Sequence, residues 1–216
     1  MPGAASLLDS LTPGSRQFLL ERSTVRRLRD DEHLFHHGDV ADCMYLIESG
    51  RLAVQTTTSE GDTAIVRVIG PGHVVGELAL LVDGMRRTGS VVALGASVVR
   101  VVHRALFSEL RARDPGVDRA LVADLAERLA ALSEQFVVNQ FGTLADRVIE
   151  RLLVLDAVYR HTWIEVNQEE LGAMVGGSRQ AVNRVLADAA AAGLVSVRRG
   201  AVRVLDPDAL ARHQRF

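Results

Sequence analysis

The chain has 216 residues, of which 48% are hydrophobic and 24% charged, a composition typical of globular proteins and not of disordered ones. Its 25 basic residues nearly balance its 27 acidic ones, so no overall positive field draws it to nucleic acid or to an anionic membrane. Any such binding needs a local patch. The single cysteine, Cys43, excludes an intramolecular disulfide, a zinc site built from cysteines and a four-cysteine iron–sulfur cluster.

Two features bear on the compartment in which the protein works. A lone cysteine fits a reducing environment, and the amino terminus lacks a positively charged run followed by an apolar core. Nowhere do about eighteen apolar residues follow one another, as a membrane-spanning helix would need. We therefore expect a cytoplasmic protein that is not exported and has no membrane partner.

From about Val25 to Val102 the chain consists of short β-rich runs separated by glycines, among them MYLIESGRLAVQT, AIVRVIGPGHVVGEL and GSVVALGASVVRVV. Evenly spaced strand signals of this kind are typical of a small antiparallel barrel or roll. The sequence therefore predicts an antiparallel β-roll in the first part of the chain.

After residue 116 the pattern changes to helical spacing, with apolar residues three and four positions apart. The neighbouring positions are charged or polar, so the apolar stripe is narrow, as in a coiled-coil seam. A helix that packs against its own roll and a helix that pairs in a two-fold dimer both fit this pattern. The narrow stripe favours a homodimer, with a pairing helix at about residues 115–140. Its seam residues are Val122, Leu125, Leu129, Leu132 and Phe136.

The last part of the chain, from about Gly142, predicts a helix-turn-helix. Asn167 and Glu170 have the spacing of a capping box at the start of one helix. The glycine pair 176–177 ends that helix, and Ser178 can cap a second one. Two alternating strands follow, LVSVRR and AVRVL, and they read as a hairpin wing.

Between residues 177 and 203 the charge is strongly positive, with five arginines and one acid. On the second helix four polar side chains share one broad face: Arg179, Gln180, Asn183 and Arg184. Arginine pairs bidentately with guanine and glutamine with adenine, while groups at a helix amino terminus meet phosphates. A solvated polar face is the alternative, but the wing and the arginine excess favour DNA. Asn167 is a secondary candidate for a phosphate contact, beside its capping role.

The segment GELALLVDGMRRTGSV, residues 76–91, combines small residues, one acid and an arginine pair. A phosphate needs backbone N–H groups that small residues leave accessible, and a guanidinium that engages two oxygens. Glu77 beside a phosphate suggests a partner such as a sugar hydroxyl, and hence a nucleotide. The alternative is an ordinary surface turn. The candidate phosphate ligands are Gly76, Ala79, Thr88, Gly89 and one of Arg86 or Arg87.

Four segments, in this order, resemble the Crp/Fnr family of bacterial transcription factors, and together they cover nearly all of the chain. LFHHGDVADCMYLIESGRLAV resembles the first roll strands, and GPGHVVGELALLVDGMRRTGSV the phosphate-binding cassette. RLAALSEQFVVNQFGTLADRVIERLLVL resembles the dimer helix and hinge, and LGAMVGGSRQAVNRVLADAAAAGLV the DNA-reading unit. The resemblance implies an α+β fold with two domains. Residues 1–140 form a jelly-roll-like cyclic-nucleotide-binding β-roll with its dimer helix, and 141–216 a winged helix-turn-helix.

The resemblance also implies roles for individual residues. Glu77 would hold a ribose 2′-hydroxyl, Arg87 would pair with the cyclic phosphate and Thr88 would add a hydroxyl contact. In members that respond to cyclic AMP, adjacent threonine and serine residues of the dimer helix hold the adenine; here they are Leu132 and Ser133. Leu132 has no hydroxyl, so the adenine contact keeps only the hydroxyl of Ser133. Packing in the dimer seam explains the presence of Leu132 equally well. Backbone groups would complete the contacts to the cyclic nucleotide near Gly76, Leu78, Ala79 and Gly89.

In the second helix of the DNA-reading unit, Arg179 and Arg184 match the family's base- and phosphate-contacting arginines. Gln180 stands where many relatives carry a glutamate that accepts a hydrogen bond from cytosine. Because glutamine favours adenine or no base contact, the preferred half-site is expected to differ at one position.

The histidines give no metal site at the level of sequence. His33, His36 and His37 cluster before a glycine and His73 lies near the cassette, but no acidic or cysteine partner stands at ligand spacing. We interpret the cluster as solvated and Cys43 as a small core residue, and we expect no metal cofactor. The absence of paired carboxylates, a nucleophile elbow and metal spacing argues against an enzyme with catalytic residues.

We therefore predict a homodimeric, ligand-responsive DNA-binding regulator whose effector is cyclic AMP. Its expected partners are a pseudo-palindromic DNA duplex and RNA polymerase. A hinge near residues 139–143 would set the two recognition helices one DNA turn apart, about 34 Å between half-sites. The alternatives are the same regulator acting constitutively, or one that senses cyclic GMP, a cyclic dinucleotide or a haem-borne gas.

Overall fold

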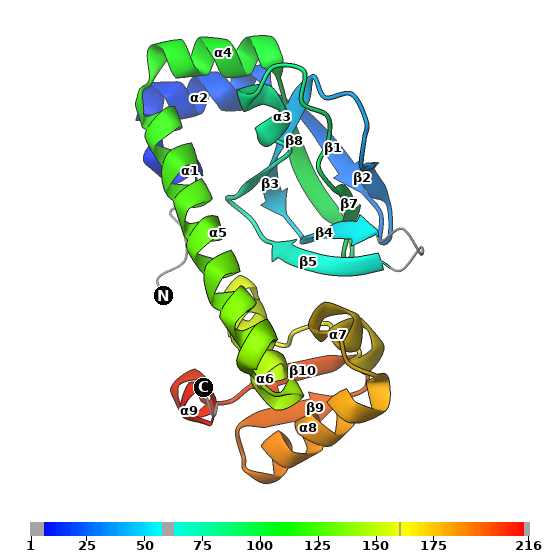
Figure 1. Cartoon of the computed structure of the whole chain (residues 1–216). Helices are drawn as coiled ribbons and strands as arrows, with labels where there is room; N and C mark the ends of the chain where they lie inside the picture. The colour runs from blue at the N-terminus through cyan, green and yellow to red at the C-terminus, as the bar shows by residue number, and fades with distance from the viewer. Residues whose placement is uncertain (1–6, 58–62, 160, 214–216) are drawn as a thin grey trace. The chain divides into compact units, whose positions relative to one another are not determined.

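The computed structural model describes residues 7–57, 63–159 and 161–213 (Figure 1). The chain divides into two compact units. Of the described residues, the first unit holds 7–57 and 66–129, and the second holds 63–65 and those from 130 onwards. The main boundary therefore lies within the long helix α5 (Gly116–Phe141). Among the residues described, no helix is long and apolar enough to cross a membrane.

The first unit is built around two four-stranded sheets, with strand orders β1-β8-β3-β6 and β2-β7-β4-β5 (Figure 1). The ladders that join β8 to β1 and β3, β3 to β6, and β7 to β2 and β4 are all antiparallel. This confirms the predicted antiparallel roll. The strands are β1 (Thr24–Leu28), β2 (His33–Phe35), β3 (Cys43–Ser49), β4 (Leu52–Thr57), β5 (Thr63–Ile69), β6 (Val74–Val75), β7 (Ser90–Ala93) and β8 (Ser97–His103).

Strand β3 is buried on both faces, because successive side chains of a strand point in opposite directions. Cys43, Tyr45 and Ile47 belong to a core that draws residues from both sheets. Met44 and Leu46 belong to a second core. That second core is covered by α1 (Leu7–Ser10), α2 (Pro13–Arg22), α4 (Arg104–Arg113) and the first turns of α5.

Asp114 joins the helices that cover this second core. Its carboxylate accepts hydrogen bonds from the backbone N–H of Thr12 at 2.9 Å and of Gly116 at 2.8 Å. These bonds, the one from Thr12 first, lower the pKa of Asp114 to about 2. The start of α2 is thereby tied to the junction of α4 and α5.

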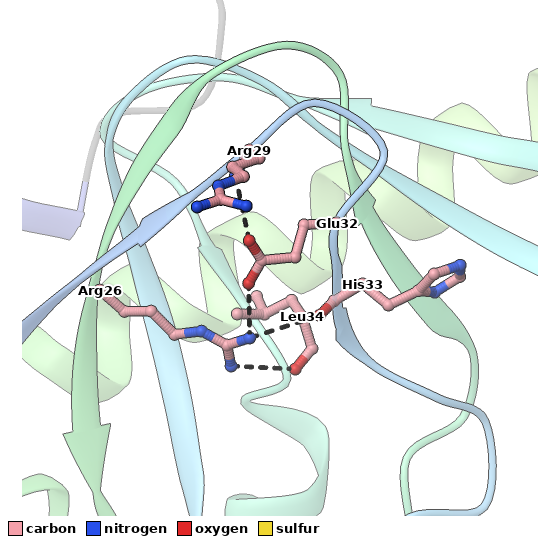
Figure 2. Close-up of polar contacts among 5 residues, drawn as sticks. All are labelled: Arg26, Arg29, Glu32, His33 and Leu34. Carbon is pink, nitrogen blue, oxygen red and sulfur yellow. Dashed lines mark hydrogen bonds and ion pairs between the residues drawn. The ribbon is translucent and has the colours of Figure 1, made fainter.

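The turn between β1 and β2 is held by the carboxylate of Glu32 (Figure 2). One oxygen accepts from the guanidinium of Arg26 and the other from the backbone N–H of Arg29, both at 3.1 Å. Arg26 also donates to the carbonyls of His33 and Leu34, each at 3.4 Å. The bond from Arg29, followed by that from Arg26, holds the pKa of Glu32 below its ordinary value. These contacts set the path of the chain into β2.

The second unit confirms the predicted helix-turn-helix and wing (Figure 1). Asn167 Oδ1 accepts from the backbone N–H groups of Glu169 and Glu170, each at 2.9 Å, and Glu170 completes the capping box. Gly176 ends the first helix in the left-handed conformation, with φ of 65°. Ser178 caps the second. The elements are α6 (Leu144–Val158), α7 (Gln168–Val175), α8 (Arg179–Ala191), β9 (Val195–Arg198), β10 (Ala201–Val204) and α9 (Pro207–Arg212).

Candidate ligand site and nucleic-acid interface

Arg87 is the central residue of the cassette, and it is 4% exposed although it carries a charge. Its Nη1 donates to the carbonyl of Gly76 at 2.8 Å and its Nη2 to the carbonyl of Cys43 at 2.7 Å. The guanidinium carbon lies 4.2 Å from the ring centre of Phe35 and 5.6 Å from that of Tyr45, within cation–π range. These neutral partners fix the side chain without neutralising its charge.

One nitrogen of the Arg87 guanidinium, the buried Nε, has no acceptor within the described part of the chain. Because buried polar groups are nearly always hydrogen-bonded, an orphaned cationic N–H indicates that an acceptor is missing. Arg86, in contrast, is exposed and donates to the carbonyl of Gly38 at 2.9 Å. The structure therefore distinguishes the two adjacent arginines, and only Arg87 has the surroundings of an anion ligand.

The small residues of the cassette allow this close packing. Gly76 has φ of +81°, and a Cβ on it would lie 2.2 Å from Arg87 Nη1. A Cβ on Gly89 would lie 3.0 Å from the carbonyl oxygen of Gln55. Leu78 and Ala79 begin α3 (Leu78–Leu81), and the first amides of a helix have no acceptor within it. Thr88 is exposed beside them.

Glu77 is 1% exposed and forms an ion pair with Arg128 of α5. Arg128 also pairs with Asp124, one helical turn earlier, and donates to the carbonyl of Val74 at 3.3 Å. The sequence reasoning missed Arg128, as it did Phe35 and Tyr45. Local spacing could not reveal it, because α5 and the cassette meet only in the fold. A buried carboxylate that is paired in this way can accept a further hydrogen bond.

Two more titratable groups surround this ion pair. Burial lowers the pKa of Arg67 on β5 to about 10, and the positive charge of Arg128 adds to that effect. Burial also lowers the pKa of His73 and so favours the neutral imidazole, whereas the negative charge of Asp124 acts in the opposite direction. His33, His36 and His37 are exposed, as the interpretation of a solvated cluster requires, and the rings of His33 and His36 stack at 4.4 Å.

The remaining predicted ligand residues, Leu132 and Ser133, lie in the part of α5 that belongs to the second unit, and both are exposed. Four of the five predicted seam positions are more than half exposed in the single chain, and Leu125 is half-buried. An exposed apolar stripe on a long helix marks an interaction surface. The four exposed positions are Val122, Leu129, Leu132 and Phe136.

Helix α8 presents the predicted DNA-reading face to solvent. Val182 and Leu186 are buried, whereas Arg179, Gln180, Asn183 and Arg184 are all exposed. Ser178 Oγ accepts from the backbone N–H of Ala181 at 3.3 Å, and Asn167 is occupied by its capping box. In the wing, the guanidinium of Arg198 lies 4.2 Å from the ring centre of Trp163.

Comparison with known proteins agrees with this architecture. Residues 25–114 match the family model of the cyclic nucleotide-binding domain, and residues 146–213 that of the Crp-like helix-turn-helix domain. The Cyclic AMP receptor protein of Thermus thermophilus is 30% identical over 198 residues, which is 92% of this chain and 91% of the relative. The cAMP-activated global transcriptional regulator CRP of Escherichia coli O6:H1 is 29% identical over 181 residues, or 81% and 86% of the two chains.

Among solved structures, the c-di-GMP responsive global regulator CLP of Xanthomonas campestris has a TM-score of 0.76 at 22% identity, covering 90% of this chain and 100% of that one. This likeness shows the fold. A cyclic nucleotide-binding domain followed by a helix-turn-helix defines a DNA-binding transcription regulator rather than an enzyme. The chain belongs to the Crp/Fnr family of such regulators, as its sequence motifs predict.

Proposed function

We propose that this protein is a homodimeric transcription regulator that binds cyclic AMP in the cassette around Arg87. The environment of Arg87 carries the proposal. A buried guanidinium held by two carbonyls, with an orphaned Nε and a glycine against Nη1, is a site prepared for an anion. A cyclic phosphate supplies one negative charge and two free oxygens, which match a guanidinium fork.

The other cassette residues fit the rest of a nucleotide. Thr88 adds a hydroxyl to the phosphate, and amides near Gly76, Leu78, Ala79 and Gly89 complete the cradle. Glu77, which is paired with Arg128, accepts from the ribose 2′-hydroxyl. Leu132 and Ser133 are the proposed base contacts, of which only Ser133 offers a hydroxyl.

Cyclic AMP is the proposed effector, and the alternatives among nucleotides differ from it in the base or in the number of nucleotides. A relative described as c-di-GMP responsive shares the fold, so cyclic dinucleotides and cyclic GMP are tested beside cyclic AMP. A haem-borne gas and constitutive action are the remaining alternatives.

The proposed output is DNA binding by two copies of α8. Arg179, Gln180, Asn183 and Arg184 would read the major groove, and Ser178 and Asn167 would lie near phosphates. The stripe on α5 would pair the protomers, so the operator is pseudo-palindromic with half-sites about 34 Å apart. RNA polymerase is the proposed further partner, and the cytoplasm the proposed location.

Coupling between the two proposed domains, 1–140 and 141–216, would pass through α5 and the break between Phe141 and Leu144. The ligand regulates DNA binding only if it binds the active arrangement more tightly than the inactive one.

The test is calorimetric titration of the full chain with cyclic AMP, cyclic GMP and cyclic di-GMP. We expect micromolar binding of cyclic AMP that Arg87→Ala abolishes. Arg86→Ala, which removes the same charge from the exposed neighbour, should bind as the unchanged protein does. Absence of heat with every nucleotide, in a dimer that still binds DNA, would overturn the proposed effector and favour constitutive action.

A further inference from the structure

Asp42, Cys43 and His103 bring a carboxylate, a thiol and an imidazole to one end of the β3–β8 ladder. One donor atom from each lies within 4.8 Å of the other two. His103 Nδ1 is 3.8 Å from Asp42 Oδ2. No spacing rule applied to the sequence finds this group, because His103 is far from the other two residues along the chain.

The backbone holds all three residues in place. Cys43 and His103 face each other in the antiparallel ladder between β3 and β8. Asp42 directly precedes β3, and its carbonyl accepts from the backbone N–H of Arg104 at 2.8 Å. Ligands mounted on regular elements keep their geometry better than ligands on loops. The scaffold of this group is therefore fixed before any ligand arrives.

Exposure divides the three side chains into an anchor and two movable groups. Cys43 is buried, whereas the side chains of Asp42 and His103 are 78% and 60% exposed. Tetrahedral zinc with ligand bonds of about 2.1 to 2.3 Å places its ligand atoms about 3.4 to 3.8 Å apart. Rotamer changes of the two exposed side chains can close the present separations to that range around the fixed sulfur.

The charge balance also suits a divalent cation. A thiolate and a carboxylate carry two negative charges, and the third ligand is a neutral imidazole. Arg87 and Tyr45 also face the sulfur, and Arg87 Nη2 donates to Sγ at 3.6 Å. Burial, the largest effect, raises the pKa of the Cys43 thiol. When a metal binds, the S–H bond breaks, the sulfur lone pair forms the metal bond and the proton goes to solvent.

We propose that Asp42, Cys43 and His103 form a binding site for a zinc-like divalent metal ion, with water as the fourth ligand. Thiolate and imidazole together select borderline-soft metals such as Zn²⁺ over Mg²⁺ or Ca²⁺. The proposal does not rest on the proposed effector, although Arg87, the proposed phosphate ligand, donates to both the carbonyl and the sulfur of Cys43.

The experiment uses the full chain, stripped of metal and titrated with Co²⁺. Cobalt bound by a thiolate gives a charge-transfer band in the near ultraviolet, and tetrahedral coordination gives intense visible bands. We expect one Co²⁺ per chain, displaced by Zn²⁺. Cys43→Ser should remove the charge-transfer band, and Asp42→Asn and His103→Asn should each weaken binding by at least about tenfold. His36→Asn, an exposed histidine of the same unit, is the matched control and should leave the titration unchanged.

Absence of the thiolate band overturns the proposal. A band that neither Asp42→Asn nor His103→Asn weakens also overturns it, because the metal would then be held by Cys43 with other ligands. Loss of the band in His36→Asn points to the exposed histidine cluster and overturns it as well. Since Asp42 and His103 are exposed, their variants keep the test valid even if Cys43→Ser does not fold.

Discussion

At the scale of single residues, the contact between Gly76 and Arg87 leaves no room for a side chain. Gly76→Ala would place a Cβ 2.2 Å from Nη1 of Arg87 and would strain a backbone with φ of +81°. Gly84→Ala carries similar strain, with φ of +75°, but its Cβ meets no atom within 4 Å. Such strain costs about 1 kcal/mol or more in either variant.

We expect Gly76→Ala to weaken cyclic nucleotide binding by at least about tenfold, because about 1.4 kcal/mol of lost anion contact suffices for that factor. Gly84→Ala should bind normally. Calorimetry measures both affinities, and thermal unfolding reports the shared strain. An equal loss of affinity in the two variants would show that backbone strain, and not displacement of Arg87, is the cause.

Asp114 gives a prediction about acid stability. Its pKa is about 2 in the folded protein, against 3.8 for an ordinary aspartate, mainly because it accepts from the N–H of Thr12. A lowered pKa stabilises the folded state above pH 3.8, and this contribution is lost as the pH falls from 3.8 towards 2. Asp114→Asn should therefore unfold more easily at neutral pH, and its difference from the unchanged protein should shrink across that window.

Chemical denaturation at a series of pH values measures this difference. Asp83→Asn, in which a fully exposed carboxylate is neutralised, is the control and should shift stability little at any pH. A gap between Asp114→Asn and the unchanged protein that stays constant down to pH 2 would contradict the role given to Asp114.

At the scale of elements, the turn of the helix-turn-helix depends on close backbone approach. A Cβ on Gly172 of α7 would lie 2.5 Å from the carbonyl oxygen of Gly177. Gly172→Ala should destabilise the protein by about 1 to 3 kcal/mol, as overpacking does, and weaken DNA binding. Gly14→Ala in α2, where a Cβ meets nothing within 4 Å, should be neutral or slightly stabilising. Thermal unfolding measures the stability of the two variants, and fluorescence anisotropy measures their DNA binding. Equal stability and equal DNA affinity of Gly172→Ala and Gly14→Ala would contradict the close packing of Gly172 against Gly177.

The stripe on α5 is the second element with a testable role. Phe136 is 66% exposed in the single chain. We expect Phe136→Glu to weaken the proposed dimer by at least about tenfold, because it puts a charge where pairing would bury apolar surface. Sedimentation equilibrium measures the association. Glu127→Ala, an exposed charge outside the seam, should leave it unchanged. A chain that is monomeric without substitution would exclude the pairing proposed for α5.

At the scale of the whole molecule, a protein with a formal net charge of −2 must bind DNA through its local arginines. Affinity should fall steeply with salt, by a slope of about 0.9 for each phosphate contact. Arg199→Ala, at the exposed tip of the wing, should reduce that slope by about 1 for every DNA sequence. Gln180→Ala should leave the slope unchanged and alter the preference at one base position. Anisotropy titrations at several salt concentrations separate the two effects. The same change in both variants would contradict the assignment of Arg199 to a phosphate and of Gln180 to a base.

The sequence by itself determined those features that depend on neighbours a few residues apart. The cap at Asn167, the glycine stop at Gly176 and the cap at Ser178 are local hydrogen-bonding and backbone choices, so the helix-turn-helix was predictable with its boundaries. The change from period two to helical spacing likewise located the roll and α5. Helix α2 was missed, because it buries only Ser15 and Leu19 and so has little apolar periodicity.

Only the tertiary structure decided which polar residues share a site. Arg86 and Arg87 are neighbours in the sequence, but the contact of strand β3 with the cassette buries one and leaves the other in solvent. The pairing of Glu77 with Arg128 depends on long-range packing in the same way. The meeting of Cys43 with His103 depends on strand register. Local chemistry fixes the elements, whereas burial and register select the partners, because those free energies depend on contacts between segments distant in the chain.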